Sequence, residues 1–374
     1  SEPQPPTQKP PQTPLMRLAL AQLNPLVGDL AGNGELILAA CHQAAAQGAD
    51  LVLTPELSLW GYPPRDLLLR PSLIAKQGVV LDQLAAALAR ELPLLAVLVG
   101  MAEPSGAAPL PNLFNAVALV EAGSWRVVAR KRLLPTYDVF DEQRYFCAAT
   151  GPSVLELERG GRSWRLGLTI CEDLWVEEEL QGHRLAGADP VAELLSSRID
   201  LLLNLSASPF GQAKVALRQS LAARASSRLT CPVVYVNQVG GNDELVFDGA
   251  SFVVDASSGV DAGSAVVSQL ASCKEQVSCW EVNGAAPVAS LPVAPVPTEN
   301  EQLFRALVLG VADYARKCGF SSALLGLSGG IDSALVAVIA AAALGGERVQ
   351  ALMMPSPWSS AGSLNDAQDL AGRL

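Results

Sequence analysis

Apolar and polar residues follow two different periods along the chain, and the pattern predicts alternating strands and helices. Helical spacing of apolar residues predicts helices at residues 33–47, opened by an asparagine N-cap, at 72–91, near Ala192 and at 212–228. Short apolar runs predict strands at residues 17–23, 50–54, 94–101, 115–120, 125–131, 165–170, 200–206, 233–238 and 247–255. This order, without an internal repeat, predicts an α/β protein with helices around a strand-rich core.

The pattern is interrupted at residues 283–300, where Pro, Ala and Val alternate without a core period. We expect a linker there, between a first domain at residues 16–282 and a second at residues 301–374. The second region predicts helices at 301–318 and 332–344, strands at 323–327 and 348–354, and a last helix opening at Ser363. Because no further strand follows, we expect this second domain to be incomplete.

Composition narrows the class of protein. The chain has 374 residues, half of them apolar, and a net charge of −11, which disfavours nucleic acid as a partner. No apolar run is long enough to span a membrane. The Pro- and Gln-rich residues 1–15 predict a disordered tail. Seven cysteines without a CxxC pair indicate a reducing compartment, with the cytoplasm as the expected location, and neither a disulfide framework nor a metal site is assigned.

Three reactive side chains follow predicted strands. Glu56 comes after residues 50–54, Lys131 ends residues 125–131, and Cys171 follows residues 165–170. In a sheet whose strands share direction, such ends meet at one edge. A buried glutamate can take the proton of a thiol, the thiolate is a nucleophile, and a lysine can stabilise the oxyanion that forms on an attacked carbonyl.

Simpler interpretations exist for each residue alone. A cysteine in an apolar run is usually a core residue, and a single glutamate or lysine is usually solvated. The two histidines, His42 and His183, lie in helix-like and loop-like segments, where a solvated or packed residue is the ordinary interpretation. Only the combination of Glu56, Lys131 and Cys171 favours nucleophilic catalysis without histidine.

The segments T54-PELSLWGYPP64, K131-RLLPTYDVFDE142 and L168-TICEDLW175 resemble the carbon-nitrogen hydrolase, or nitrilase, superfamily over about residues 16–275. The resemblance implies an α-β-β-α sandwich, with Glu56 as base, Lys131 as oxyanion stabiliser and Cys171 as nucleophile. It also implies Glu142 as a second carboxylate near the triad. Residues that would contact the amide substrate, glutamine, are Tyr137, Glu172, Ser206 and Lys214.

A second signature, S328-GGIDS333, lies between a predicted strand and a helix. Bare backbone N–H groups and a helix N-terminus at such a turn can bind an anion, although an ordinary tight turn also explains two adjacent glycines. The sequence resembles the pyrophosphate loop of ATP pyrophosphatases, which implies the start of a Rossmann-like parallel-sheet domain of the adenine nucleotide alpha hydrolase type. By this resemblance, ATP phosphates are held by Ser328, Gly329, Gly330, Asp332 and Ser333.

The two signatures together resemble the family of glutamine-dependent NAD synthetases. This resemblance implies glutamine, ATP with Mg²⁺ and nicotinic acid adenine dinucleotide as substrates, no tightly bound prosthetic group, and assembly as a homo-oligomer. We expect only the glutaminase half to be complete in residues 1–374. Two alternatives stay open: a separate amidase that is indifferent to ATP, and a catalytically silent assembly module with an unreactive Cys171.

Overall fold

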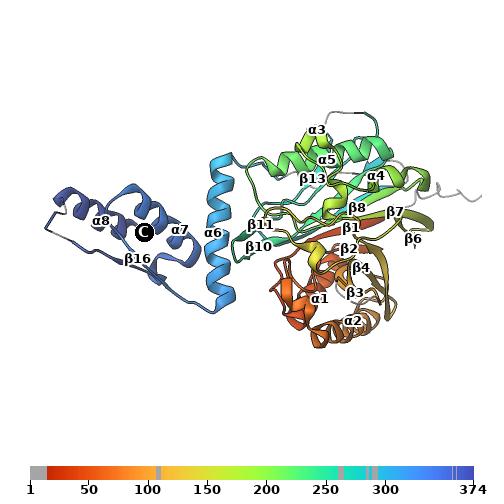
Figure 1. The fold of residues 1–374 in the computed structure, drawn as a ribbon, viewed down its shortest axis with the longest axis horizontal. Coiled ribbons are helices and arrows are strands. Elements are labelled where there is room, and N and C mark those ends of the chain that lie inside the picture. The colour runs from red at the N-terminus through yellow and green to blue at the C-terminus, as the bar shows by residue number, and fades with distance from the viewer. Residues whose placement is uncertain are drawn as a thin grey trace, which may run out of the picture.

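The computed structural model describes residues 15–106, 111–259, 265–283, 286–288, 294–355, 357–358 and 360–374. The predicted disordered tail lies outside these residues except for Leu15, which begins the first strand. Figure 1 shows a larger body that contains two sheets, a smaller C-terminal unit, and helix α6 (Glu299–Cys318) between them.

The first sheet has seven strands in the order β15-β14-β1-β2-β3-β4-β5. Strands β1, β2 and β3 are parallel, whereas β14, β4 and β5 join antiparallel to their neighbours. In chain order these strands are β1 (Leu15–Gln22), β2 (Leu51–Leu53), β3 (Ala96–Pro104), β4 (Leu113–Glu121), β5 (Ser124–Arg130), β14 (Gln276–Asn283) and β15 (Ala286–Val288).

The second sheet has six strands in the order β13-β12-β9-β8-β7-β6. Its central strands β7, β8 and β9 are parallel, and the outer ones are antiparallel to their neighbours. The strands are β6 (Ser153–Arg159), β7 (Arg162–Ile170), β8 (Leu201–Ser206), β9 (Val233–Asn237), β12 (Phe252–Val254) and β13 (Val266–Gln269).

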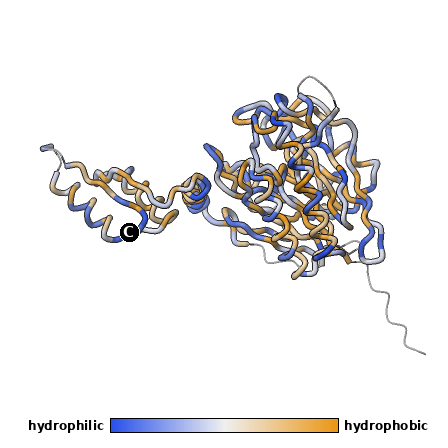
Figure 2. Tube along the Cα trace, turned by 90° about the horizontal axis from the view of Figure 1, so that it is seen from below, coloured by the Kyte–Doolittle hydropathy of each residue, from blue (hydrophilic) through white to orange (hydrophobic). Residues whose placement is uncertain are grey.

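The two sheets stack face to face and helices cover their outer faces. One buried cluster joins residues of both sheets, such as Leu20 of β1 and Leu203 of β8. Helices α1 (Leu30–Ala46) and α2 (Pro71–Glu91) bury their apolar sides against the first sheet, and α4 (Pro190–Glu193) and α5 (Lys214–Leu229) cover the second. Apolar segments gather inside this body (Figure 2). The predicted α-β-β-α sandwich is therefore confirmed.

Several local predictions were wrong. Helix α1 begins at Leu30 behind Asp29, whose side chain accepts a hydrogen bond from the Gly32 N–H. Asn33 is not the cap: it lies inside the helix, and its amide donates to the carbonyls of Leu26 and Leu59. Strands β6, β10, β13, β14 and β15 were not predicted, and β15 lies inside the expected linker, where it pairs with β14.

The expected strand at residues 247–255 is two strands in different sheets. It divides into β11 (Leu245–Asp248) and β12, which are separated by Gly249 at a φ of 64°. A side chain at position 249 would collide with Gln22, because a Cβ there would lie 2.3 Å from the Gln22 carboxamide carbon. Strand β11 pairs instead with β10 (Val239–Asn242) in a hairpin.

The C-terminal unit is small. Strands β16 (Ala323–Gly326) and β17 (Val349–Leu352) are parallel, and helices α7 (Ile331–Leu344) and α8 (Ala361–Arg373) pack beside them. The remaining short helix is α3 (Glu178–Gln181), and single 3₁₀ turns lie at Arg65–Leu69, Glu142–Arg144, Cys171–Leu174, Leu195–Ser197 and Gly346–Arg348.

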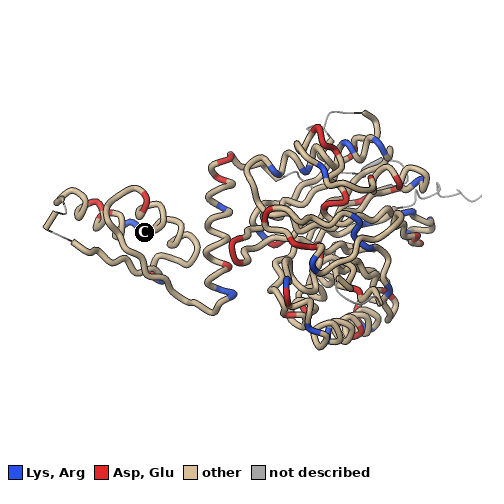
Figure 3. The backbone as a smooth tube through the Cα atoms, in the orientation of Figure 1, with Lys and Arg blue, Asp and Glu red and all other residues tan. Residues whose placement is uncertain are grey.

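Exposed apolar side chains are not spread evenly: many of the large ones lie in the C-terminal unit, such as Leu324, Ile331 and Trp358, which are 68%, 83% and 93% exposed. Acidic and basic residues are interspersed over both parts of the molecule (Figure 3). Within the described ranges, none of the helices has the length and apolar character that a bilayer crossing requires.

Candidate active site

The three predicted reactive residues come together at one end of the sandwich. Glu56 follows β2 and Lys131 follows β5, both in the first sheet, whereas Cys171 follows β7 in the second. The expectation that they share one sheet edge was therefore wrong. They meet because the strands that precede them, the parallel strands β2 and β7 and the antiparallel strand β5, end on the same side of the two stacked sheets.

Lys131 is at the centre of a buried charge network. Its Nζ lies 2.7 Å from Glu56 Oε1 and 2.8 Å from Glu142 Oε1. Lys131 is 1% exposed, Glu56 1% and Glu142 4%. Burial alone would lower the pKa of Lys131, but Glu142 and Glu56 outweigh burial and hold its pKa well above the usual range. The ammonium is therefore retained without access to water.

Neutral groups complete the network. Asn115 donates through Nδ2 to Glu56 Oε1 across 2.7 Å, and the Ala207 N–H donates to Glu56 Oε2 across 3.1 Å. Tyr62 donates its hydroxyl to Glu142 Oε1 across 2.8 Å. Burial raises the pKa of Glu142 to about 7, although Lys131 opposes that shift. Glu142 is thus a carboxyl group that can hold a proton near neutral pH.

Cys171 occupies a strained position directly beside this network. Its φ of 44° lies in the left-handed region, which non-glycine residues rarely adopt, and the 3₁₀ turn Cys171–Leu174 begins there. Burial first, and then the charges of Glu56 and Glu172, raise the pKa of the thiol, while Lys131 and the Ala207 N–H favour the thiolate. The resting group is a thiol, and a neighbouring base must take its proton before it can act as a nucleophile.

Asp173 ties the two sheets together at this point. One carboxylate oxygen accepts from the N–H groups of Arg132 and Leu133, at 3.0 and 2.8 Å, and the other accepts from Ile170 at 3.1 Å. The residues that flank Lys131 and Cys171 are therefore held by one side chain. The sequence reasoning missed this role, although Asp173 lies in the C-E-D segment that signalled the site.

The residues predicted to contact glutamine have different partners in the structure. Tyr137 donates to both carboxylate oxygens of Glu172, at 2.9 and 3.0 Å, and the ring of His183 packs edge-on at 5.1 Å from the Tyr137 ring. Lys214 places its ammonium 5.7 Å from the centre of the Trp175 ring. Ser206 is fully buried and directs its hydroxyl to Asn204.

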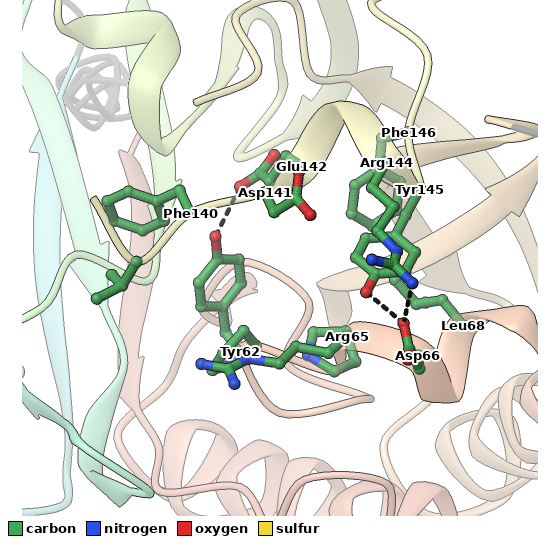
Figure 4. Close-up of a pocket in the computed structure, with 13 residues that line it drawn as sticks. Tyr62, Arg65, Asp66, Leu68, Phe140, Asp141, Glu142, Arg144, Tyr145 and Phe146 are labelled. Carbon is green, nitrogen blue, oxygen red and sulfur yellow. Dashed lines mark hydrogen bonds and ion pairs between the residues drawn. The ribbon is translucent and has the colours of Figure 1, made fainter. Parts of the chain in front are cut away.

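A cavity of about 550 Å³ opens beside the network, and Tyr62 and Glu142 belong to its wall. Figure 4 shows the Tyr62 hydroxyl directed at Glu142, and Asp66 bonded to Tyr145 and paired with Arg144 on another side of the cavity. Glu56, Lys131 and Cys171 are not among its lining residues, so the network lies behind the Tyr62–Glu142 contact.

The second predicted site lies in the C-terminal unit, where residues 327–330 connect β16 to α7. Gly329 has a φ of 81°, and the Gly330 N–H donates to Ser328 Oγ across 3.2 Å. Ser333 accepts from the Ser328 N–H at 3.2 Å and donates to the Gly330 carbonyl at 3.1 Å. The structure brings the predicted residues into one exposed turn at the N-terminus of α7.

Each of the two parts of the chain matches a known protein family. Residues 17–263 match the carbon-nitrogen hydrolase family, and residues 303–374 match the NAD synthase family. The chain is 45% identical over 364 residues to the glutamine-dependent NAD(+) synthetase of Synechocystis sp., covering 96% of this chain and 63% of that protein. It is 41% identical over 368 residues to the enzyme of that name from Rhodobacter capsulatus, covering 97% and 61%. The chain thus spans 61% to 63% of the length of these relatives.

Solved structures agree with this assignment. Glutamine-dependent NAD+ synthetase from Acinetobacter baumannii, solved in complex with ADP, superimposes with a TM-score of 0.82 at 34% identity, covering 96% of this chain and 63% of that one. An amidase from Nesterenkonia sp. shares the fold with a TM-score of 0.54 at 24% identity, covering 72% and 90%. With a sandwich of this fold and a family match over residues 17–263, the chain belongs to the carbon-nitrogen hydrolase family.

Proposed function

We propose that the chain acts in glutamine-dependent NAD(+) synthesis, with glutamine hydrolysis in the sandwich and ATP binding at the turn before α7. The observation that carries this proposal is the buried Glu56–Lys131 pair beside Cys171, in a chain whose C-terminal part matches the NAD synthase family. Relatives that match 96% and 97% of this chain carry that name. The homo-oligomeric state and the cytoplasmic location stay predictions.

The proposed hydrolysis needs no histidine. Glu56 accepts the Cys171 thiol proton, and the thiolate attacks the side-chain amide carbon of glutamine. The Lys131 ammonium stabilises the oxyanion of the tetrahedral intermediate. Its collapse breaks the C–N bond, ammonia leaves with the proton from Glu56, and a water then hydrolyses the thioester to give glutamate and the free thiol.

The charged residues near Cys171 suit a zwitterionic substrate. The Glu172 carboxylate, fixed by the Tyr137 hydroxyl, is available to an α-ammonium group. The Lys214 ammonium is available to an α-carboxylate, and partial burial lowers its pKa, as does the charge of Arg218. In this proposal these two charges distinguish glutamine from simple amides.

The turn at residues 328–333 would hold the phosphates of ATP. Backbone N–H groups at the start of α7 favour an anion. Within the described parts of the chain, no group of three or more His, Cys, Asp or Glu side chains is arranged to bind a metal ion. Since Mg²⁺ at nucleotide sites takes one or two carboxylates together with phosphate oxygens, Asp332 is suited to provide one ligand, and bound Mg²⁺ would neutralise phosphate charge. The adenylated acceptor would be nicotinic acid adenine dinucleotide.

Labelling with an electrophilic glutamine analogue tests the first step. We expect one adduct, located on Cys171 by mass spectrometry, blocked by excess glutamine and absent from Cys171→Ala. Cys231→Ala, which removes another buried thiol, should label and hydrolyse glutamine like the wild type. Wild-type glutamine turnover by Cys171→Ala, or no adduct on a folded wild-type sample, would contradict the proposal.

The shared fold with an amidase favours a second candidate, an amidase of simple amides. It predicts faster hydrolysis of small aliphatic amides than of glutamine, and labelling that glutamine does not block. The same experiment therefore separates the two.

A further inference from the structure

Asp313 of α6 is a buried carboxylate that faces the sandwich. It is 4% exposed. Its Oδ2 accepts from the Gly241 N–H at 2.8 Å and from Asn24 Nδ2 at 2.7 Å, while Oδ1 accepts from Arg316 at 3.1 Å. Burying a carboxylate is costly unless it is hydrogen-bonded. The Gly241 contact fixes α6 on the β10–β11 hairpin, and the Asn24 contact fixes it on the loop after β1.

Glycines allow the β10–β11 hairpin and α6 to pack closely against each other. A Cβ added at Gly241 would lie 3.1 Å from the Gly310 Cα, and one added at Gly310 would lie 3.2 Å from Val246. Lys317, one turn after Asp313, donates to the Gly241 carbonyl across 2.8 Å. Gly241 is thus held through both its N–H and its C=O, and Figure 1 shows α6 lying along the hairpin.

The first strand of the hairpin leads directly to the candidate active site. Gln238 immediately precedes β10 and is 2% exposed. Its side chain accepts from the Tyr62 N–H and donates to the Tyr62 carbonyl, both at 3.1 Å. The Tyr62 hydroxyl in turn donates to Glu142, which contacts Lys131.

The second strand leads to the other side of the site. Asp248 ends β11 and pairs with the fully buried Arg218 at 2.9 Å. Arg218 also donates to Ser208 Oγ and to the Ser208 carbonyl, at 3.1 and 3.2 Å. Ser208 follows Ala207, whose N–H contacts Glu56. The hairpin is therefore bonded to α6 at one end and to two supports of the charge network at the other.

We propose that Asp313 is a positioning residue, which sets the geometry of Glu142 and Lys131 through the β10–β11 hairpin, Gln238 and Tyr62. The proposal rests on the proposed glutamine hydrolysis. In this proposal α6, the helix that joins the two parts of the chain, couples the position of the C-terminal unit to the geometry of the charge network. A change in the position of α6 would then alter the reactivity of Cys171 without any contact between α6 and the substrate.

The test uses Asp313→Asn in the full chain, with Glu301→Gln as a matched control, because Glu301 forms an exposed ion pair with Arg305 on the same helix. We expect Asp313→Asn to lower kcat for glutamine about 3- to 10-fold with KM within about twofold, since geometry at the reacting atoms changes and substrate contacts do not. Alkylation of Cys171 by iodoacetamide should slow in parallel. The control should match the wild type in both measurements.

A double-mutant cycle with Gln238→Met tests the route. If Asp313 acts through Gln238, the double variant should be no slower than the slower single variant. Additive losses, or wild-type kcat in a folded Asp313→Asn, would overturn the proposal. Should Asp313→Asn fail to fold, Lys317→Met, which removes the contact to the Gly241 carbonyl, takes its place with the same expectations. A wild type that labels at Cys171 but does not hydrolyse glutamine would instead contradict the proposed function.

Discussion

Lys131 and Glu56 form an ion pair at 2.7 Å in which neither side chain is exposed to solvent. Both charges are therefore removed from water. The Lys131 ammonium contacts two carboxylates, because Glu142 Oε1 lies 2.8 Å from the same nitrogen. Breaking a buried pair leaves an uncompensated charge, which costs far more than losing a surface pair. Removing one partner alone should therefore destabilise the fold, in addition to removing a candidate catalytic group.

Replacing Lys131 with methionine tests both roles. We expect the free energy of unfolding to fall by about 3 kcal/mol, because two buried carboxylates lose the ammonium group that both contact. Glutamine hydrolysis should be lost. Urea denaturation at pH 7 and a glutaminase assay measure the two effects.

A surface pair on the preceding residue provides the control. Arg130 pairs with Glu103 while 45% of its side chain is exposed. Arg130→Met should change stability by less than about 1 kcal/mol, because exposed pairs contribute little. Equal losses from the two variants would show that Lys131 has no special environment.

Glu142 makes stability depend on pH in a defined direction. Its pKa rises from 4.5 in the unfolded chain to about 7 in the folded protein, chiefly through burial. Between these values the folded protein holds a proton that the unfolded chain releases, so stability falls as pH rises through this window. The penalty is absent below pH 4.5 and complete above pH 7.

Glu142→Gln removes this titration. The stability of the wild type relative to Glu142→Gln should therefore decrease by up to about 3 kcal/mol between the lower and upper end of that window. Urea denaturation of both proteins at several pH values measures the difference, in which titrations common to both cancel. A constant difference would mean that the pKa of Glu142 is not raised by folding.

The proximity of Glu56, Lys131 and Cys171 could be predicted because each follows a recognisable strand, whereas their catalytic roles stay predictions. Their supports could not be predicted. Tyr62, Asn115 and Gln238 act through contacts with residues 59 to 176 positions away, and a distance of that kind leaves no periodic signal in the sequence. Asn33 shows the same limit on a smaller scale: a good N-cap residue was used for tertiary hydrogen bonds instead.

The fold was predicted best where one face of an element is buried. The amphipathic helix α2 was placed to within one residue, whereas the strands β13 and β15 are short and gave no alternating pattern. The division of residues 247–255 into two strands depends on Gly249 packing against Gln22, which is a contact between distant segments. Sheet edges and strand breaks of this kind are set by tertiary packing rather than by local pattern.

Lys214 should matter for glutamine and not for amides that lack an α-carboxylate. In Lys214→Met we expect KM for glutamine to rise about 10-fold or more with little change in kcat, because a charge-assisted contact made equally in the ground and transition states is lost. Lys76→Met, an exposed lysine on α2, serves as the control. An equal rise in KM for an analogue without the α-carboxylate would mean that Lys214 does not act by binding the carboxylate.

The adjacent glycines of the C-terminal turn should respond differently to alanine. Gly329 has a φ of 81°, and a Cβ there would lie 2.2 Å from the Ser363 carbonyl oxygen, so Gly329→Ala should destabilise the C-terminal unit by about 1–2 kcal/mol or more. Gly330 has an ordinary φ of −83°, and its Cβ would meet only Ser328 Oγ, at 3.3 Å. Gly330→Ala should therefore fold normally.

If phosphates approach this backbone, the methyl group added in Gly330→Ala should still weaken ATP binding, measured by calorimetry in the presence of Mg²⁺. Unchanged ATP affinity in a folded Gly330→Ala would mean that the phosphates do not bind at this turn. Lost affinity with unchanged stability would mean that ATP binding requires the uncovered backbone at Gly330, because the fold of the unit is then intact.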